Sequence, residues 1–242
     1  TMHREMVDVL KTAARDKETR VLVITGAGDA FCAGQDLKEF FYDQRDPHEF
    51  EPIVEASIDW RVRLLRAFPA PTIAAVNGWC FGGAFSIVAS CDIAIAADEA
   101  TFGLSEINFG NFPGGLVTKQ VADVFRPRDA MFYILTGRQF SGKKAAELGF
   151  VTYSVPKESL MADVKSLAKE LAEKEPTALR MCKDIYRASL EMPNYEVALM
   201  WSMAKSDSLS LLQNNAWVEK GIGQFLEGKY RPGFGAFDKD AK

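Results

Sequence analysis

The strongest structural signal in the sequence is Val76-Asn77-Gly78-Trp79-Cys80-Phe81-Gly82-Gly83-Ala84-Phe85-Ser86. The apolar run Thr72–Val76 that leads into it predicts a buried strand. Asn77-Gly78 is a turn pair, and Gly82-Gly83 opens a helical segment of small residues that ends near Cys91. A strand, a glycine loop and a helix start can together present unpaired backbone N–H groups to a small negative charge.

The glycine pair Gly82-Gly83 has two interpretations. It binds an anion or ligand, or it only lets the helix pack closely on the strand. Neither phosphate-binding pattern, G-x-x-x-x-G-K-[ST] or G-x-G-x-x-G, occurs in this stretch. Ser86 is a poor hydrolase nucleophile, because it lies outside a G-x-S-x-G elbow and the only histidines are His3 and His48.

A second candidate for chemistry is Glu106, in the otherwise apolar segment Phe102–Ile107. Burial in such a segment raises the pKa of a carboxyl group toward the range of a general acid or base. The alternative is a structural carboxylate paired with a lysine. Asp92, which follows Cys91, is interpreted as a cap for a turn amide rather than as a catalyst.

Composition narrows the class of protein. The 242 residues allow one large domain or a domain and a half, and the net charge of −4 argues against nucleic acid as the main partner. No apolar run reaches the roughly 18 residues of a membrane helix. Four cysteines without a C-x-x-C pair predict reduced, buried thiols in a reducing, cytoplasmic compartment, and argue against a zinc site: Cys32, Cys80, Cys91 and Cys182.

The rest of the chain predicts an α/β protein with strands in the first half and helices in the C-terminal third. Strands are expected at 21–26, 92–97 and 101–104, and helices at 1–17, 55–67, 116–124, 128–135, 142–148, 159–175, 176–190 and up to about 228. A helix start is expected near Asp36, a flap or loop at 41–52 and a loop at 108–115. Five aromatic residues line a pocket or belong to the core: Phe40, Phe41, Tyr42, Trp60 and Trp79.

Several segments, in order, resemble the crotonase (enoyl-CoA hydratase/isomerase) superfamily. They are Ile24-Thr-Gly with Phe31-Cys-Ala-Gly-Gln-Asp-Leu-Lys, Pro71-Thr-Ile-Ala-Ala-Val-Asn-Gly with Gly82-Gly83, Cys91-Asp-Ile-Ala-Ile-Ala, Thr101-Phe-Gly-Leu-Ser-Glu106-Ile and Pro113-Gly-Gly. Within the superfamily, 77–86 and 97–108 look most like the hydroxycinnamoyl-CoA (feruloyl-CoA) hydratase-lyases. The family begins with a β-hairpin that contacts CoA, and we expect this hairpin to be absent from the chain.

The resemblance implies roles for individual residues. The backbone N–H groups of Gln35 and Gly83 would form an oxyanion hole for the thioester oxygen. Hydratases of the superfamily use two glutamates; this chain, like the hydratase-lyases, has Ser86 at the first position and retains Glu106 at the second. Ala33 and Leu37 would line the CoA path, and Ser105, Phe109 and Gly114 the acyl pocket.

The chain departs from the hydratase-lyases at two positions. Their two tyrosines against the substrate's phenol correspond here to Phe40 and Met203. This departure favours a less polar aryl or alkyl acyl group.

We therefore predict a crotonase-type ββα spiral core over residues 1–178 and a C-terminal helical region over 179–242 that makes trimer contacts. The predicted activity is hydration of an enoyl-CoA or aryl-enoyl-CoA, followed by retro-aldol cleavage to an aldehyde and acetyl-CoA. The alternatives are a plain enoyl-CoA hydratase or isomerase, and a catalytically weak crotonase-fold scaffold or RNA-binding protein. We expect no cofactor beyond the CoA of the substrate, no metal, no nucleic acid and no membrane, and a homotrimer or dimer of trimers.

Overall fold

The computed structural model describes residues 2–42 and 46–229, apart from the side chains of residues 39, 42, 47 and 49. The chain divides into two compact units, Thr1–Ser166 and Leu167–Lys242. This division falls earlier than the predicted one at 178/179. The middle of the predicted flap, the side chain of Tyr42 and the tail beyond residue 229 lie outside the described residues.

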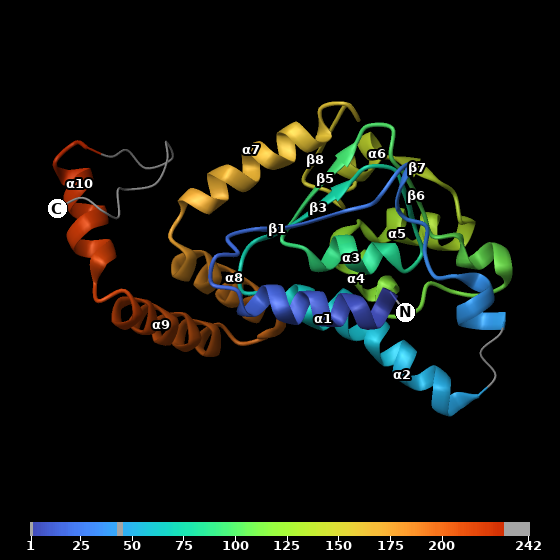
Figure 1. The fold of residues 1–242 in the computed structure, drawn as a ribbon, viewed down its shortest axis with the longest axis horizontal. Coiled ribbons are helices and arrows are strands. Elements are labelled where there is room, and N and C mark those ends of the chain that lie inside the picture. Colours follow the sequence, from blue (N-terminus) through green and yellow to red (C-terminus); the bar gives the residue numbers. More distant parts are fainter. Residues whose placement is uncertain (1, 43–45, 230–242) are drawn as a thin grey trace. The chain divides into compact units, whose positions relative to one another are not determined.

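The first unit contains both sheets (Figure 1). Its elements are α1 (Met2–Arg15), β1 (Leu22–Thr25), β2 (Ala30–Cys32), η1 (Lys38–Tyr42), α2 (Pro47–Ile58), η2 (Asp59–Leu64), β3 (Thr72–Val76), β4 (Trp79–Phe81), α3 (Ala84–Ser90), β5 (Ile93–Ala97), β6 (Thr101–Gly103), η3 (Ser105–Phe109), α4 (Val117–Val124), α5 (Pro127–Thr136), β7 (Phe140–Ser141), α6 (Gly142–Glu147) and β8 (Tyr153–Val155). Helix α7 (Leu160–Glu173) crosses the boundary between the units.

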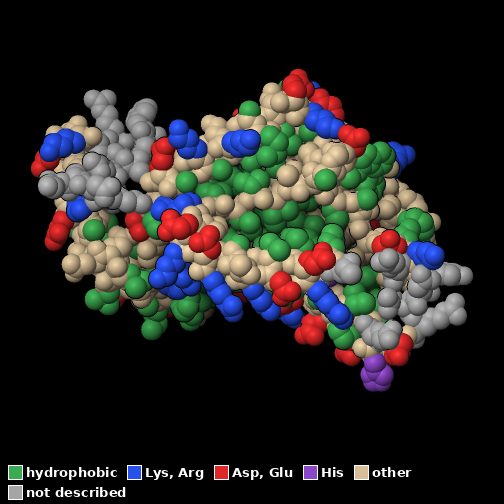
Figure 2. All heavy atoms as spheres, viewed as in Figure 1, with side chains coloured by type: hydrophobic (Ala, Val, Ile, Leu, Met, Phe, Trp, Pro, Cys, Tyr) green, Lys and Arg blue, Asp and Glu red, His purple; other side chains and the backbone are tan. Residues whose placement is uncertain are grey.

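The first sheet has the strand order β1-β3-β5-β8 and is parallel throughout. Strand β3 lies inside it and is buried along its whole length, as its uninterrupted apolar sequence predicts. Its register pairs Val23 with Ile73 and Ala75 with Ile95. Figure 2 shows hydrophobic side chains gathered over strands β1, β3 and β5 on this face of the molecule. The strands predicted at 21–26, 72–76 and 92–97 are confirmed.

The second sheet has the order β2-β4-β6-β7, with β7 antiparallel to β6. Of its strands, only β6 corresponds to a strand predicted from the sequence. Strand β4 lies where the sequence predicts only a turn and loop, and β7 lies between the helices predicted at 128–135 and 142–148. These strands have two or three residues, which is too short for a periodic pattern to appear.

Strands of the two sheets alternate along the chain. Strand β1 leads into β2, β3 into β4 and β5 into β6, and a helical segment follows each pair. Strand β8 of the first sheet, at 153–155, was also missed. The alternation is the predicted ββα spiral.

The predicted flap at 41–52 is wrong in its second half, because α2 begins at Pro47. Asp46 caps this helix by accepting a hydrogen bond from His48 N–H, and Pro47 occupies a position in the first turn where a missing N–H costs little. Pro52 lies inside the helix. The predicted helix at 55–67 is the continuation of α2 through the π-helix η2.

The second sheet is called the short sheet because its strands have two or three residues, and the core beside it is aromatic. Phe85 of α3 stacks on Phe150 with a ring-centre distance of 4.7 Å, and Phe102 stacks on Phe140 at 5.5 Å. Asp92 accepts hydrogen bonds from Thr72 N–H and Oγ1 at 2.8 and 2.9 Å, so the predicted capping role is confirmed. Of the four free cysteines Cys80 is buried, whereas Cys182 is exposed, so the prediction that all four are buried is wrong.

The second unit is helical, as predicted, with α8 (Pro176–Glu191), α9 (Tyr195–Leu212), η4 (Trp217–Ile222) and α10 (Gly223–Leu226). Asn194 caps α9 by accepting a hydrogen bond from Glu196 N–H. Large apolar side chains on this unit are exposed, among them Tyr195, Met200, Leu211, Leu212 and Leu226. Within residues 2–42 and 46–229, no helix is both long and apolar enough to cross a membrane.

Candidate active site

Three loops meet at one edge of the short sheet. Strands β2, β4 and β6 are parallel neighbours, so their carboxyl ends lie at the same edge. Gln35 follows β2, Gly82-Gly83 follows β4, and Glu106 follows β6. Three segments that are far apart in the sequence are thereby brought together, as in other open α/β sheets that bind ligands at the carboxyl ends of their strands.

The turn after β4 requires both of its glycines. Gly82 has a φ of +51°, and a Cβ there would lie 2.8 Å from Oε1 of Glu106. A Cβ on Gly83 would overlap Nη1 of Arg61. Gly82 N–H donates to Gly103 O at 3.1 Å, which ties the turn to the end of β6. Glu106 therefore requires a glycine at position 82, and the buried Arg61 requires one at position 83.

Gln35 is held by its side chain and not by its backbone N–H. Its Nε2 donates to Oγ of Ser57 at 3.0 Å, and its Oε1 lies 2.8 Å from Nε2 of His3. Trp60 Nε1 in turn donates to Nδ1 of His3 at 3.0 Å. The backbone N–H groups of Gln35 and Gly83 have no hydrogen-bond partner in the described part of the chain. They are the two groups predicted to form the oxyanion hole.

Glu106 lies in the 3-10 helix η3, which Gly110 ends in a left-handed conformation. Its Oε2 is buried and has no hydrogen-bond partner among the described residues. Burial raises the pKa of the Glu106 carboxyl, and a hydrogen bond from its own backbone N–H acts in the opposite direction. No lysine or arginine among the described residues pairs with it, so the alternative of a salt-bridged structural carboxylate is excluded there.

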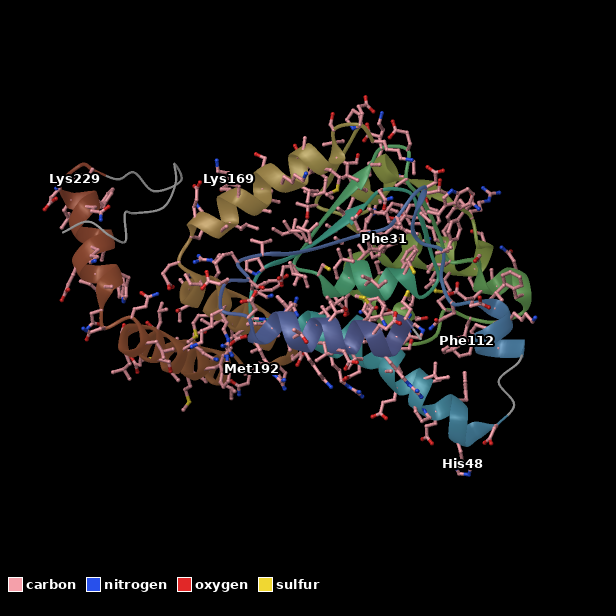
Figure 3. All side chains as sticks on the ribbon, in the orientation of Figure 1. Phe31, His48, Phe112, Lys169, Met192 and Lys229 are labelled. Atoms are coloured by element: carbon pink, nitrogen blue, oxygen red, sulfur yellow. The ribbon has the colours of Figure 1, made fainter. Side chains whose placement is uncertain are left out.

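Ser86 is fully buried in the first turns of α3, and its Oγ donates to Gly115 O at 3.4 Å. His48 lies at the start of α2 with its side chain directed outward (Figure 3). His3 is bonded to Gln35 and Trp60 instead. No histidine therefore serves Ser86 as a base, and the hydrolase alternative is excluded.

The predicted binding residues lie around these loops or on the second unit. Ala33 and Leu37 are exposed on the loop after β2, and Ser105 opens η3 beside Glu106. Phe109 and Gly114 are exposed after η3. Met203 lies on α9 of the second unit with 60% of its surface exposed.

The aromatic residues singled out in the sequence separate into two groups. Phe40 contacts Phe41 and Phe50, each with ring centres 5.0 Å apart, and the ring of His3 at 6.1 Å. Trp60 is buried beside His3. Trp79 stacks on Phe81 instead, at 5.4 Å. Phe40 and Trp60 thus lie near the Gln35 side chain through His3.

Three polar residues of the site were not predicted from the sequence: His3, Ser57 and Arg61. Arg61 Nη1 donates to Gly83 O at 3.0 Å, and its Nη2 donates to Ser57 Oγ at 2.5 Å. A signal was present, because Ser57 and Arg61 share a helix face with the apolar Leu65 at four-residue intervals. A charged residue on an apolar helix face is a reason to look for a buried partner.

No group of three metal-ligating side chains with metal-site geometry occurs among the residues that the structure describes. The site is therefore described by a carboxylate, two backbone N–H groups and a buried guanidinium. Such an arrangement can hold a developing oxyanion while one carboxylate moves protons.

Comparison with known proteins agrees with this geometry. The model of the enoyl-CoA hydratase/isomerase family matches residues 1–235. The hydroxycinnamoyl-CoA hydratase-lyase of Pseudomonas fluorescens is 46% identical over 242 residues, which cover 99% of this chain and 87% of that protein. The carnitinyl-CoA dehydratase of Citrobacter koseri is 34% identical over 190 residues, 78% of this chain and 71% of that protein.

Solved structures match the fold as well. Enoyl-CoA hydratase subunit I of Geobacillus kaustophilus superposes with a TM-score of 0.83 at 33% identity, covering 95% of this chain and 86% of that chain. The enoyl-CoA hydratase of Mycobacterium smegmatis superposes with a TM-score of 0.85 at 26% identity, covering 94% and 86%. The predicted crotonase-type fold is confirmed.

Proposed function

Because the chain belongs to the enoyl-CoA hydratase/isomerase family, we propose that it hydrates an aryl-enoyl-CoA thioester and then cleaves the product to an aldehyde and acetyl-CoA. It is an enzyme of the hydratase and lyase class. The observation that carries the proposal is the unpartnered, buried Oε2 of Glu106 beside Gly82, at the same sheet edge as the unpartnered N–H groups of Gln35 and Gly83.

Hydration needs one carboxylate in this scheme. Ionised Glu106 takes a proton from a water molecule whose oxygen bonds to Cβ of the enoyl group. The electrons of the double bond move toward the thioester oxygen, which becomes an enolate oxygen held by the N–H groups of Gln35 and Gly83. Glu106 then returns the proton to Cα, which completes the addition of water and restores the carboxylate.

Cleavage uses Glu106 and the same two N–H groups a second time. Glu106 takes the proton of the β-hydroxyl, the Cα–Cβ bond breaks, and the oxygen and Cβ leave as an aldehyde. The electron pair of the broken bond forms the enolate of acetyl-CoA in the same oxyanion hole, and Glu106 protonates its Cα. Both steps pass through an enolate, so one set of donors stabilises both transition states. CoA enters as part of the substrate, and the scheme uses no further cofactor.

The substrate-binding surface is assigned by the family resemblance. Ala33 and Leu37 line the CoA path, while Ser105, Phe109 and Gly114 line the acyl pocket. Phe40 and Met203 take the positions that face the far end of the acyl group. Support comes from the exposure of Leu37 and Phe109, at 57% and 69%, which leaves these apolar side chains available to a ligand.

The assembly and location are also proposals. The exposed apolar side chains of the second unit support a homotrimer or a dimer of trimers. The four free cysteines support a reducing, cytoplasmic location. The net charge of −4 supports the absence of a nucleic-acid partner.

A second candidate function is hydration without cleavage. Phe40 favours it, because a phenylalanine at this position cannot hydrogen-bond a phenolic hydroxyl and polarise the ring for cleavage. The similarity to a carnitinyl-CoA dehydratase, whose name includes no cleavage step, agrees with this candidate. The retained Glu106 with its raised pKa argues against the remaining alternative, a scaffold or RNA-binding protein.

The test is to incubate the protein separately with feruloyl-CoA and with a short-chain enoyl-CoA and to analyse the products. Aldehyde and acetyl-CoA from feruloyl-CoA support the full sequence. A β-hydroxyacyl-CoA without aldehyde supports the hydratase alternative and removes the cleavage step. If a folded protein forms neither product from either thioester, both candidate functions are contradicted.

A further inference from the structure

Arg61 is a buried cation with no counter-anion among the described residues. It lies on the π-helix η2 with 7% of its surface exposed, and it forms no ion pair within the described residues. Burial lowers the pKa of its guanidinium. A buried charge that is not neutralised by a partner is costly, so such a residue calls for an explanation.

Three hydrogen bonds join Arg61 to described residues at the candidate oxyanion hole: one to Gly83 and two to Ser57. Nη1 donates to Gly83 O at 3.0 Å, Nε donates to Ser57 O at 2.9 Å, and Nη2 donates to Ser57 Oγ at 2.5 Å. The same Ser57 Oγ accepts from Nε2 of Gln35 at 3.0 Å. One guanidinium thus connects the residues that supply both unpartnered N–H groups.

The space next to Gly83 is filled by this guanidinium. A Cβ on Gly83 would overlap Nη1 of Arg61, and a Cβ on Gly115 would lie 3.8 Å from its Nη2. The side chain of Arg61 is therefore fixed between its own helix η2 and the start of α3. Its positive charge is held against the carbonyl of Gly83, the residue whose own N–H is a candidate donor of the oxyanion hole.

We propose that Arg61 is a positioning residue of the oxyanion hole, which fixes the Gln35 and Gly83 loops relative to each other and supplies a positive charge that is neutralised only when the enolate forms. This inference rests on the proposed function. It explains why an unpaired cation is buried here, because a charge that is uncompensated in the ground state and compensated in the transition state lowers the barrier.

The first test compares Arg61→Met with Arg63→Met. Arg63 lies on the same π-helix but is exposed and forms a surface ion pair with Asp59. Arg61→Met should lower kcat about 10- to 100-fold with little change in KM, whereas Arg63→Met should leave both unchanged.

The Tm of Arg61→Met separates the proposed role from a purely structural one, because a structural role predicts a lower Tm. After Arg61→Met, Gly83 O still accepts from Ser86 N–H and Ser57 Oγ still accepts from Gln35. The Tm should therefore equal or exceed that of the unchanged protein, because an unpaired buried charge is removed. A lower Tm with an unchanged kcat would identify a structural arginine and overturn the inference.

The second test measures binding without turnover. In a Glu106→Gln background, an oxyanion hole that polarises the thioester carbonyl should shift the absorption band of bound cinnamoyl-CoA to longer wavelength. Adding Arg61→Met should remove most of the shift, and adding Arg63→Met should preserve it. If Glu106→Gln alone shows no shift, the oxyanion hole of the proposed function fails. If the shift is present and Arg61→Met leaves it unchanged, only the role of Arg61 fails.

Ser57→Ala keeps the inference testable if Arg61→Met does not fold. It removes the oxygen that joins Gln35 to Arg61 and leaves the charge in place. A smaller shift and a several-fold lower kcat support the inference. An unchanged shift together with an unchanged kcat overturns it.

Discussion

The chain passes alternately through the two sheets of the first unit, called here the long sheet (β1-β3-β5-β8) and the short sheet (β2-β4-β6-β7). Their strands differ in length and in composition. Strands β1, β3 and β5 of the long sheet have four or five residues, chiefly Ala, Ile and Val. Strands β2, β4 and β6 of the short sheet have three residues each, and glycine lies at or close to the end of each. The long sheet buries apolar surface, and the short sheet brings three loops to one edge.

This difference predicts a division of labour. Substitutions in the long sheet should lower stability with little effect on the chemistry of folded molecules. Substitutions at the edge of the short sheet should lower turnover with little effect on stability, or even raise it. Single variants in each sheet can separate these two effects, and the greatest loss is expected at the carboxylate of the short-sheet edge.

Glu106→Gln should lower kcat for hydration about 10²- to 10⁴-fold, because it removes the one carboxylate that moves protons in the proposed mechanism. Circular dichroism should show an unchanged fold. Glu158→Gln is the matched control, since Glu158 is exposed and away from the sheet edge. Activity within a few-fold of the unchanged protein would show that another group is the acid and base.

Ile95→Ala should lower the free energy of unfolding by about 2–5 kcal/mol, because it leaves a cavity at a fully buried position of the long sheet. Urea denaturation measures the loss, with the half-exposed Val9 of α1 changed to Ala as the control. The kcat per folded molecule should stay within about two-fold. A loss of kcat per folded molecule of ten-fold or more (~1.4 kcal/mol) would contradict the division between the sheets.

The free energy of unfolding should depend on pH through the ionisation of Glu106. Its pKa is raised in the folded protein above the ordinary value of 4.5, so the folded state binds the proton more tightly than the unfolded state. Its contribution to stability is therefore fully present below pH 4.5 and is lost as the pH rises through the pKa of the folded state. Because the side chain is only partly buried, solvent screening keeps this contribution small.

Glu106→Gln lacks this titration. The variant should match the unchanged protein in acid and be more stable at neutral pH, which urea denaturation at a series of pH values can measure. In the unchanged protein, kcat/KM should also decrease as the pH drops below the pKa of Glu106, which is raised above 4.5. A variant that is less stable at neutral pH would show that the carboxylate is well solvated or paired.

Phe40→Tyr should change the kinetics least. If Phe40 faces the far end of the acyl group, a tyrosine there should improve kcat/KM for feruloyl-CoA about 2- to 10-fold, the worth of one neutral hydrogen bond. An enoyl-CoA without a phenol should not gain. Phe132→Tyr on α5 serves as the control. An equal change for both thioesters would remove Phe40 from the acyl pocket.

The sequence alone predicted the longer elements well and the shorter ones poorly. Thr72–Val76 is a run long enough to predict a strand, whereas Trp79–Phe81 is too short for any pattern to distinguish it from a loop. The segment 41–52 is predicted to be a flap or loop, but the cap at Asp46 and the packing of α2 against α1 make its second half helical, with Pro52 inside the helix.

The site was predicted by resemblance more than by residue pattern. Gly83 and Glu106 could be singled out from glycine spacing and apolar surroundings, but Gln35 could not. Arg61 was missed because a charge in an amphipathic helix is usually assigned to its solvated face. Only the structure shows that its guanidinium lies against Gly83 O.

Whether one carboxylate at one sheet edge serves both steps can be tested with the hydrated intermediate. Synthetic β-hydroxy-β-(4-hydroxy-3-methoxyphenyl)propionyl-CoA is given to the unchanged protein and to Glu106→Gln, and aldehyde release is followed. The proposed mechanism predicts rapid release by the unchanged protein and a loss of release in the variant comparable to its loss of hydration. Release by Glu106→Gln at the unchanged rate would contradict the mechanism.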